Sequence, residues 1–325
     1  MHILVIGAAG MVGRKFVEKL ARDGTLGGKP VSRITAFDVV AATPPEASFP
    51  IDVHTGDFPE SGMAEALITD RPDIIVHLAA IVSGEAEVDF EKGYRINLDG
   101  SMKLLEAIRR AENYHPRMVF TSSIAVYGAP FPTVIPDTYY HTPLTSYGTQ
   151  KAITELLLHD YVRKGFLDGI GIRLPTIVVR PGAPNKAASG FFSNILREPL
   201  AGKEAVLPVD DSVLHWMASP RAAVGFLMHA ATMDLPAGVN GYSYTMPGQG
   251  VTVAEMIAAL GRVAGPGPVS RIRREPDDFI RGIVSGWPQT FNADAAKELG
   301  FVAEPDMDTI IRIHIEDELG GTFAE

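Results

Sequence analysis

The sequence predicts an α/β protein with a doubly wound parallel sheet, and two features of the chain support this fold class. Short strand-like segments alternate with stretches of helical periodicity along the first half of the chain, and a glycine-rich turn directly follows the first segment. Parallel strands are buried on both faces and joined by helical crossovers, so they are expected to give this alternation. The predicted strands cover residues 2–6, 32–37, 51–55, 74–77, 117–121 and 170–174.

Helical periodicity is clearest in four segments besides the helix that follows the first strand. They cover residues 60–68, 88–113, 147–164 and 307–319, the second being interrupted near Gly93 and Gly100. A Gly/Pro-rich stretch, residues 261–268, reads as a connector before the last helix. The regular alternation ends near residue 182, which predicts a second, less regular part of the chain.

The composition is that of an ordinary globular protein of 325 residues, 46% of them hydrophobic. A net charge of -10 without a dense Lys/Arg run argues against nucleic-acid binding, which depends on phosphate neutralisation. The absence of cysteine excludes disulfides and thiolate metal sites, and His77 has no second ligand at metal-binding spacing, so we expect no metal. No secretory leader pattern and no apolar run of about 20 residues is found, so we expect a cytoplasmic protein that does not interact with membranes.

The glycine-rich turn predicts a dinucleotide site. Residues 7–13 read Gly-Ala-Ala-Gly-Met-Val-Gly between the first strand and a helix that reaches about Ala21. The first glycine of such a turn permits a tight bend, the second lets backbone approach a pyrophosphate, and the third allows close packing of helix and strand. The helix N-terminus adds unpaired N–H groups and a positive dipole end. The predicted phosphate-binding residues are Gly7, Gly10, Met11, Val12 and Gly13.

Asp38, at the end of the second strand, indicates which dinucleotide is bound. Its carboxylate is placed to accept hydrogen bonds from the adenosine ribose hydroxyls, and it would repel a 2′-phosphate. The following residues, 39–42, contain no arginine that could bind such a phosphate. The sequence therefore favours NAD over NADP.

Tyr147 and Lys151 are the candidate reactive residues. They stand four residues apart at the start of a predicted helix, so both side chains can reach one pocket. A free phenol has a pKa of roughly 10, and a cation held nearby lowers it by about 1–3. Tyr147 could then exchange a proton near neutral pH.

Three motifs occur in order: the turn at residues 7–13, Val-Phe-Thr-Ser-Ser-Ile-Ala-Val-Tyr-Gly at 119–128, and Ser-Tyr-Gly-Thr-Gln-Lys-Ala at 146–152. Together they resemble the extended short-chain dehydrogenase/reductase family, which includes NAD-dependent sugar epimerases and dehydratases. The resemblance covers nearly the whole chain and is strongest over residues 1–182. It implies an NAD-binding Rossmann domain, residues 1–175 plus about 212–245, and a smaller substrate-binding lobe, about 176–211 and 246–325.

The resemblance also implies roles for individual residues. Ser123 hydrogen-bonds the reacting oxygen, Tyr147 is the general acid/base, and Lys151 lowers the pKa of Tyr147 and holds the nicotinamide ribose. NAD carries the hydride. The remaining cofactor contacts implied are Asp57, Phe58, Leu78, Ala79, Ala80, Asn97, Pro175 and Thr176. A homodimer is implied through helices around residues 88–113 and 144–164, with Ala152, Leu156 and Leu157 in its apolar face.

The second part of the chain indicates a small acidic substrate. Where nucleotide-sugar enzymes of the family carry an arginine for the diphosphate, this chain has Asp211. Residues 173–184 and 188–192 look most similar to family members that oxidise a four-carbon sugar acid at its 2-hydroxyl. Arg180 is the candidate partner of the carboxylate, although a salt bridge within the lobe would explain it equally well. Ser83 and Ser189 are further substrate-binding candidates, beside Ser123 and Tyr147.

Two other functions stay open at this point. One is a nucleotide-sugar epimerase or dehydratase of the same family, against which Asp211 and the absence of an acidic pair at Ile124 and Ala125 both argue. The other is an NAD-binding sensor without turnover. Such proteins commonly lose the tyrosine or the lysine, and both are present here.

Overall fold

The computed structural model describes residues 1–182, 189–236 and 243–324, and it divides into two compact units. Unit 1 comprises residues 1–126, 143–173 and 224–244, and unit 2 comprises residues 127–142, 174–223 and 245–325. Each unit has its own core of buried apolar side chains. Within the described residues, no helix has the length and hydrophobicity that crossing a membrane requires.

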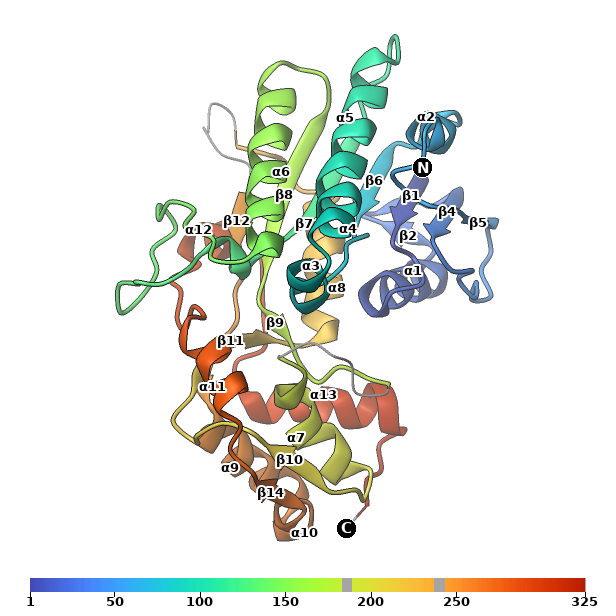
Figure 1. Cartoon of the computed structure of the whole chain (residues 1–325). Helices are drawn as coiled ribbons and strands as arrows, with labels where there is room; N and C mark the ends of the chain where they lie inside the picture. The colour runs from blue at the N-terminus through green and yellow to red at the C-terminus, as the bar shows by residue number, and fades with distance from the viewer. Residues whose placement is uncertain (183–188, 237–242, 325) are drawn as a thin grey trace. The chain divides into compact units, whose positions relative to one another are not determined.

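A seven-stranded sheet forms the centre of unit 1 and confirms the predicted fold class (Figure 1). The strand order is β12-β8-β7-β6-β1-β4-β5, and the pairs β1–β4, β4–β5, β1–β6 and β6–β7 are parallel. The order reverses at β1, and in sheets of this kind ligands bind at the carboxyl ends of the strands beside such a reversal. The strands are β1 (His2–Ile6), β4 (Arg33–Asp38), β5 (Ile51–Thr55), β6 (Ile74–His77), β7 (Arg117–Ser123), β8 (Asp168–Leu174) and β12 (Ser243–Thr245).

Helices connect these strands, and α5 and α6 run side by side (Figure 1). The interruptions predicted near Gly93 and Gly100 in the helical segment 88–113 are found there, because a six-residue π-helical segment lies between these glycines and separates two α-helices. A small hairpin, β2 (Thr25–Leu26) and β3 (Lys29–Pro30), follows α1. The helices are α1 (Met11–Asp23), α2 (Met63–Ile68), α3 (Ser83–Val88), α4 (Phe90–Gly93), the π-helix η1 (Tyr94–Asp99), α5 (Gly100–Arg110), the 3-10 turn η2 (Ile124–Val126), α6 (Ser146–Arg163) and α8 (Pro220–Ala230).

Unit 2 is built on two small sheets and several helices. A three-stranded sheet has the order β13-β11-β9, and a two-stranded sheet pairs β10 with β14. Their strands are β9 (Thr176–Ile177), β10 (Ala205–Leu207), β11 (Leu214–Ala218), β13 (Gln249–Thr252) and β14 (Ile272–Arg274). The helices are α7 (Gly190–Leu200), α9 (Val253–Ala264), α10 (Pro266–Ser270), α11 (Asp278–Ser285), α12 (Asp294–Glu298) and α13 (Met307–Leu319).

The predicted connector over residues 261–268 is wrong. Gly261 lies inside α9, and Pro266 starts α10 directly after the single break at Gly265. Proline is tolerated at the first position of a helix, since the N–H that it lacks would have no intrahelical partner there. A high Gly/Pro content therefore marks one sharp turn between two helices, for which Gly265 supplies a φ of 78°. The helix predicted over residues 307–319 is confirmed as α13.

Candidate active site

The turn between β1 and α1 has the geometry that phosphate binding requires. Gly7 has a φ of 97°, and a Cβ at this position would lie 2.6 Å from the backbone nitrogen of Ala79. A Cβ at Gly13 would lie 2.2 Å from the carbonyl oxygen of Gly7. No side chain caps the N-terminus of α1, where Gly10 is the N-cap residue. Bare backbone N–H groups are thus left at the positive end of the helix, which fits the pyrophosphate of a dinucleotide.

Asp38 lies beside this turn. Its Oδ2 accepts a hydrogen bond from the backbone N–H of Ala9 at 2.9 Å, so the carboxylate is held at the carboxyl end of β4. Val39 and Val40, directly after it, are 71% and 59% exposed. Neither of these two side chains carries a positive charge that would attract a 2′-phosphate, so the residues directly after Asp38 are compatible with NAD.

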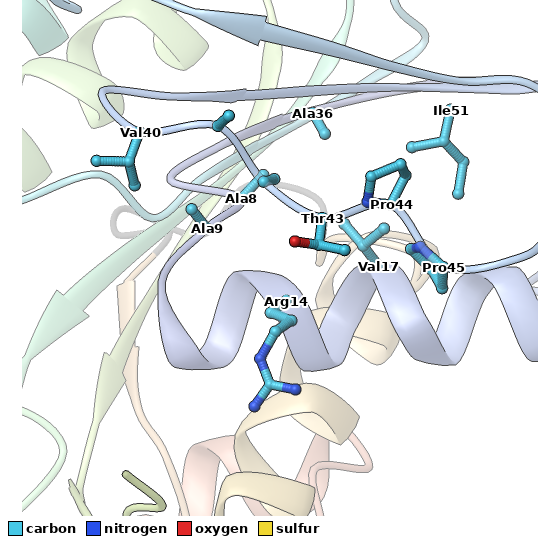
Figure 2. Close-up of a pocket in the computed structure, with 12 residues that line it drawn as sticks. Ala8, Ala9, Arg14, Val17, Ala36, Val40, Thr43, Pro44, Pro45 and Ile51 are labelled. Carbon is cyan, nitrogen blue, oxygen red and sulfur yellow. The ribbon is translucent and has the colours of Figure 1, made fainter. Parts of the chain in front are cut away.

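A cavity of about 210 Å³ lies between α1 and the loop after Asp38 (Figure 2). Arg14 is the cationic residue in its lining, and Figure 2 shows its guanidinium extending away from the loop that carries Thr43 and Pro44. Arg14 forms an ion pair with Glu18 at 2.8 Å. The cavity lining is otherwise apolar apart from Thr43, so its chemistry does not favour a phosphate.

Other predicted cofactor residues lie at neighbouring strand ends. The backbone N–H groups of Leu78 and Ala79 both donate to the carbonyl of Ile6, which fixes the chain after β6, including Ala80, beside the glycine turn. Phe58 is buried. The Asp57 carboxylate accepts from Arg95 at 2.5 Å, an ion pair in which both side chains are about half exposed.

Ser123 ends β7, and helix α6 begins directly against it. The Oγ of Ser123 accepts from the N–H of Ala125 at 3.1 Å. A Cβ at Gly148 would lie 2.1 Å from the carbonyl oxygen of Ala125, so only glycine lets the first turn of α6 approach this closely. Thr145 caps that turn by accepting from the N–H of Gly148. Tyr147, the residue before Gly148, is half-buried at this end of the helix.

Lys151 is buried, and its ammonium is held in place. Its Nζ donates to the carbonyl of Thr121 at 2.8 Å and lies 4.7 Å from the centre of the Phe120 ring and 5.7 Å from that of Tyr147. Burial lowers the pKa of Lys151 to about 7, and the negative charge of Glu155 opposes this. Lysine and tyrosine thus lie close enough for the ammonium to favour the phenolate.

Glu155 was not anticipated from the sequence. It stands four residues after Lys151, on the face of α6 that carries Tyr147, and its side chain is completely buried. Arg173 on β8 binds it at 2.7 Å, so the carboxylate has a buried cationic partner inside unit 1. The spacing of four residues was the sequence signal that could have identified it.

Asn97, within the π-helical segment, contacts the backbone and helix α6. Its Oδ1 accepts from the N–H of Ile81 at 2.9 Å, and its Nδ2 donates to the Ile81 carbonyl at 3.0 Å. The same Nδ2 donates to the Oε1 of Gln150 at 2.7 Å. The resemblance implied a cofactor contact for Asn97, and its observed side-chain contact with α6 is to Gln150, the residue before Lys151.

His77 is a packed core histidine. Its Nε2 hydrogen-bonds Ser101 at 2.9 Å, and its ring lies between Phe58 and Phe120. Burial, with a smaller effect from Lys151, lowers its pKa to about 3. Over the described ranges of the chain, no group of three His, Cys, Asp or Glu side chains could hold a metal ion.

Met11 and Val12 are the first two residues of α1, and Ser83 is the first residue of α3. The other predicted cofactor and substrate residues, Pro175, Thr176, Arg180 and Ser189, lie in unit 2. Thr176, which follows Pro175, hydrogen-bonds the Nε2 of His215 at 2.7 Å. Arg180 donates through Nη2 to the Oγ of Ser189 at 3.0 Å and through Nε to the carbonyl of Ile177. Within this unit the structure therefore brings Arg180 and Ser189 together.

Comparisons with known proteins agree on the family. A model of the NAD dependent epimerase/dehydratase family matches residues 3–216. The chain is 44% identical to the D-erythronate dehydrogenase of Cupriavidus necator, over 98% of both chains. It is 36% identical to the D-erythronate dehydrogenase of Haemophilus influenzae, over 98% of this chain and all of that one. The crystal structure of the nucleoside-diphosphate-sugar epimerase from Agrobacterium tumefaciens is similar with a TM-score of 0.97 and 60% identity, covering 99% of this chain and 95% of the other.

Proposed function

Because the chain belongs to the NAD dependent epimerase/dehydratase family, we propose that it oxidises the 2-hydroxyl of D-erythronate to 2-dehydro-D-erythronate with NAD as cofactor. The observation that carries this proposal is the 44% identity to a D-erythronate dehydrogenase over nearly the full length of both chains. Unit 1 would bind NAD, and unit 2 would contribute to substrate binding.

Three side chains of unit 1 would handle the proton. Lys151 favours the phenolate of Tyr147, and Tyr147 takes the proton of the substrate hydroxyl as general base. Ser123 donates a hydrogen bond to the same oxygen as it becomes a carbonyl oxygen. NAD, when bound, supplies the acceptor for the hydride that leaves C2. The pyrophosphate of NAD would bind at the turn formed by residues 7–13. The adenosine ribose hydroxyls would donate hydrogen bonds to Asp38.

Arg180 is the proposed partner of the substrate carboxylate. Its planar guanidinium can bind a carboxylate through two parallel hydrogen bonds, whereas an ammonium binds as a point charge. We predict that Arg180→Lys raises the KM for D-erythronate about tenfold or more, with a smaller loss of kcat. Steady-state kinetics at saturating NAD measure both constants. An unchanged KM would end the assignment of Arg180 and direct attention to Ser83 and Ser189.

Epimerisation of a nucleotide sugar is the second candidate, since the similar Agrobacterium structure is described as a nucleoside-diphosphate-sugar epimerase. Two ion pairs in unit 2 argue against it. Asp211 pairs with Arg274 at 2.8 Å, and Asp210 pairs with Arg281 at 2.8 Å. Each arginine is thereby neutralised by a neighbouring carboxylate, which leaves less positive charge for a diphosphate.

A substrate panel separates these functions. Purified protein with NAD is mixed with four- to six-carbon aldonates and with UDP-, GDP- and dTDP-sugars, and NADH absorbance is followed. Sugar products are separated in parallel, since epimerisation is redox-neutral. NADH formation with D-erythronate above the other aldonates supports the proposal. Turnover of nucleotide sugars alone would replace it with the epimerase, and NAD binding without turnover would indicate the sensor.

We also propose that the protein is a homodimer through α5 and α6. Leu156 and Met102, on these two helices, are 60% and 37% exposed. Ala152 and Leu157, expected at the same face, contribute less, because Ala152 is buried and Leu157 packs against the core of unit 1. Light scattering at micromolar concentration should give twice the mass of the 34.9 kDa chain, and Leu156→Glu should lower it. A strictly monomeric wild type would contradict the dimer.

The cytoplasm is the proposed location. NAD is available there, and a chain without cysteine gains nothing from an oxidising compartment. Cell fractionation with antibodies against the protein tests this placement.

A further inference from the structure

Gln150 is a completely buried amide in helix α6, directly before Lys151 and three residues after Tyr147. Its Oε1 accepts from Asn97, but its Nε2 has no hydrogen-bond partner among the described residues. Leaving a buried donor unpaired is destabilising. An apolar residue of the same size would avoid this cost but would leave one N–H of the buried Asn97 amide unpaired, so the amide of Gln150 is explained by its contact with Asn97.

The orientation of this amide is dictated by Asn97. Because Asn97 accepts from the N–H of Ile81 and donates to its carbonyl, reversing the Asn97 amide would break both bonds. Asn97 must therefore present a donor to α6. Gln150 in turn must present its oxygen, so its unpaired nitrogen is forced to the opposite side.

Gly93 accommodates that nitrogen. A Cβ at Gly93 would lie 2.8 Å from the Nε2 of Gln150, closer than side chains approach. Gly93 also immediately precedes the π-helical segment that places Asn97. Such irregular helical turns occur frequently at functional sites. Gly93, the π-helical segment and the Asn97 amide thus together surround the side chain of Gln150 on α6.

We propose that Gln150 is a positioning residue that holds the first turns of α6 so that Lys151 and Tyr147 keep their relative placement. The proposal builds on the proposed role of Tyr147 as base. Gln150 itself acts only through α6, with its amide fixed to η1 by Asn97. Without that contact, α6 can shift relative to β7, whose Thr121 carbonyl holds the Lys151 ammonium, and the ammonium is then less firmly held near the phenol.

The test measures the acid dissociation constant of Tyr147, which needs no substrate. The phenolate absorbance of each variant is followed as the pH is raised, and the same titration is done on that variant carrying Tyr147→Phe in addition. The difference is the titration of Tyr147 alone, because the other eight tyrosines are present in both proteins. Gln150→Met keeps the length of the side chain and removes the amide. Because a less well-held cation stabilises the phenolate less, the constant should fall at least about threefold. The melting temperature should change by less than about 4 °C.

The matched control is Thr154→Val, which removes the buried hydrogen bond from the Thr154 hydroxyl to the backbone carbonyl of Gln150 but leaves the Gln150 amide in place. It should leave the Tyr147 constant unchanged. Gly93→Ala, which displaces the amide, and Gln150→Ala, which removes it, should each lower the constant as Gln150→Met does. The double variant Gly93→Ala/Gln150→Ala should have a constant close to that of Gln150→Ala alone. A wild-type constant in Gln150→Met, an equal fall in Thr154→Val, or additive effects of Gly93→Ala and Gln150→Ala would overturn the proposal. A protein inactive on D-erythronate would overturn only the proposed substrate.

Discussion

At the scale of single residues, the candidate site depends on the positive charge of Lys151, which burial disfavours. The Lys151 ammonium is almost inaccessible, and burial lowers its pKa to about 7, so its charge depends on the groups around it. The Thr121 carbonyl stabilises the charged form by accepting its hydrogen bond, and Glu155 stabilises it through its negative charge. The cation that we propose to favour the Tyr147 phenolate is therefore stabilised by its neighbours rather than by solvent.

The direct test of this site is Tyr147→Phe. The substitution keeps the ring and removes the group that takes the substrate proton, so kcat for D-erythronate should fall by roughly 10²–10⁴. Binding of NAD, measured by calorimetry, should stay within about twofold of wild type. Tyr140→Phe is the matched control, because Tyr140 is 70% exposed and its variant should keep full activity. Near-full turnover in Tyr147→Phe would end the proposed mechanism.

At the scale of elements, the proposed joint action of Ser123 and Tyr147 depends on the approach of α6 to the end of β7. Gly148 allows this approach because a side chain there would overlap the Ala125 carbonyl. Gly148→Ala should therefore move the start of α6, lower kcat about tenfold or more, and destabilise the protein by about 1–3 kcal/mol, as overpacking does. Kinetics and thermal unfolding measure the two effects.

The control for Gly148→Ala is a second glycine-to-alanine substitution, which is expected to stabilise the protein rather than destabilise it. Gly225 lies inside helix α8 with open space at the Cβ position, so Gly225→Ala should stabilise the protein by about 0.5–1 kcal/mol and leave kcat unchanged. A Gly148→Ala enzyme that behaves like Gly225→Ala would show that the close approach of α6 is not needed for activity.

Much of this arrangement could be predicted from local sequence. The turn at residues 7–13, the strand end at Asp38 and the four-residue spacing of Tyr147 and Lys151 each depend on neighbours along the chain. The contacts of Gln150 with Asn97, 53 residues away, and of Glu155 with Arg173 could not be predicted, since they need the packing of separate elements. The π-helical segment was missed for the same reason. The π-helical turn contains one more residue than an α-helical turn. Its role is visible only in the folded protein, where Asn97 contacts both Ile81 and α6.

At the scale of the whole molecule, each unit contains a buried neutral histidine. His77 lies in the core of unit 1 and His215 in unit 2, where it stacks on Phe192. Burial lowers the pKa of His77 to about 3 and that of His215 to about 4. Neither ring can take up a proton in the folded protein at mildly acidic pH, although both can in the unfolded chain.

We therefore predict that the protein is acid-labile. The unfolded pKa is about 6.5, so the stability that each histidine permits is complete above that pH and is lost as the pH falls toward the folded value. Each histidine lowers the free energy of unfolding by about 1.4 kcal/mol per pH unit within this window, or about 2 kcal/mol between pH 6.5 and 5. Urea unfolding at pH 7 and pH 5 measures the loss. His77→Gln should reduce it by about 2 kcal/mol, whereas His54→Gln, at an exposed histidine, should not. An equal loss in wild type and His77→Gln would show that His77 is protonated in the folded protein.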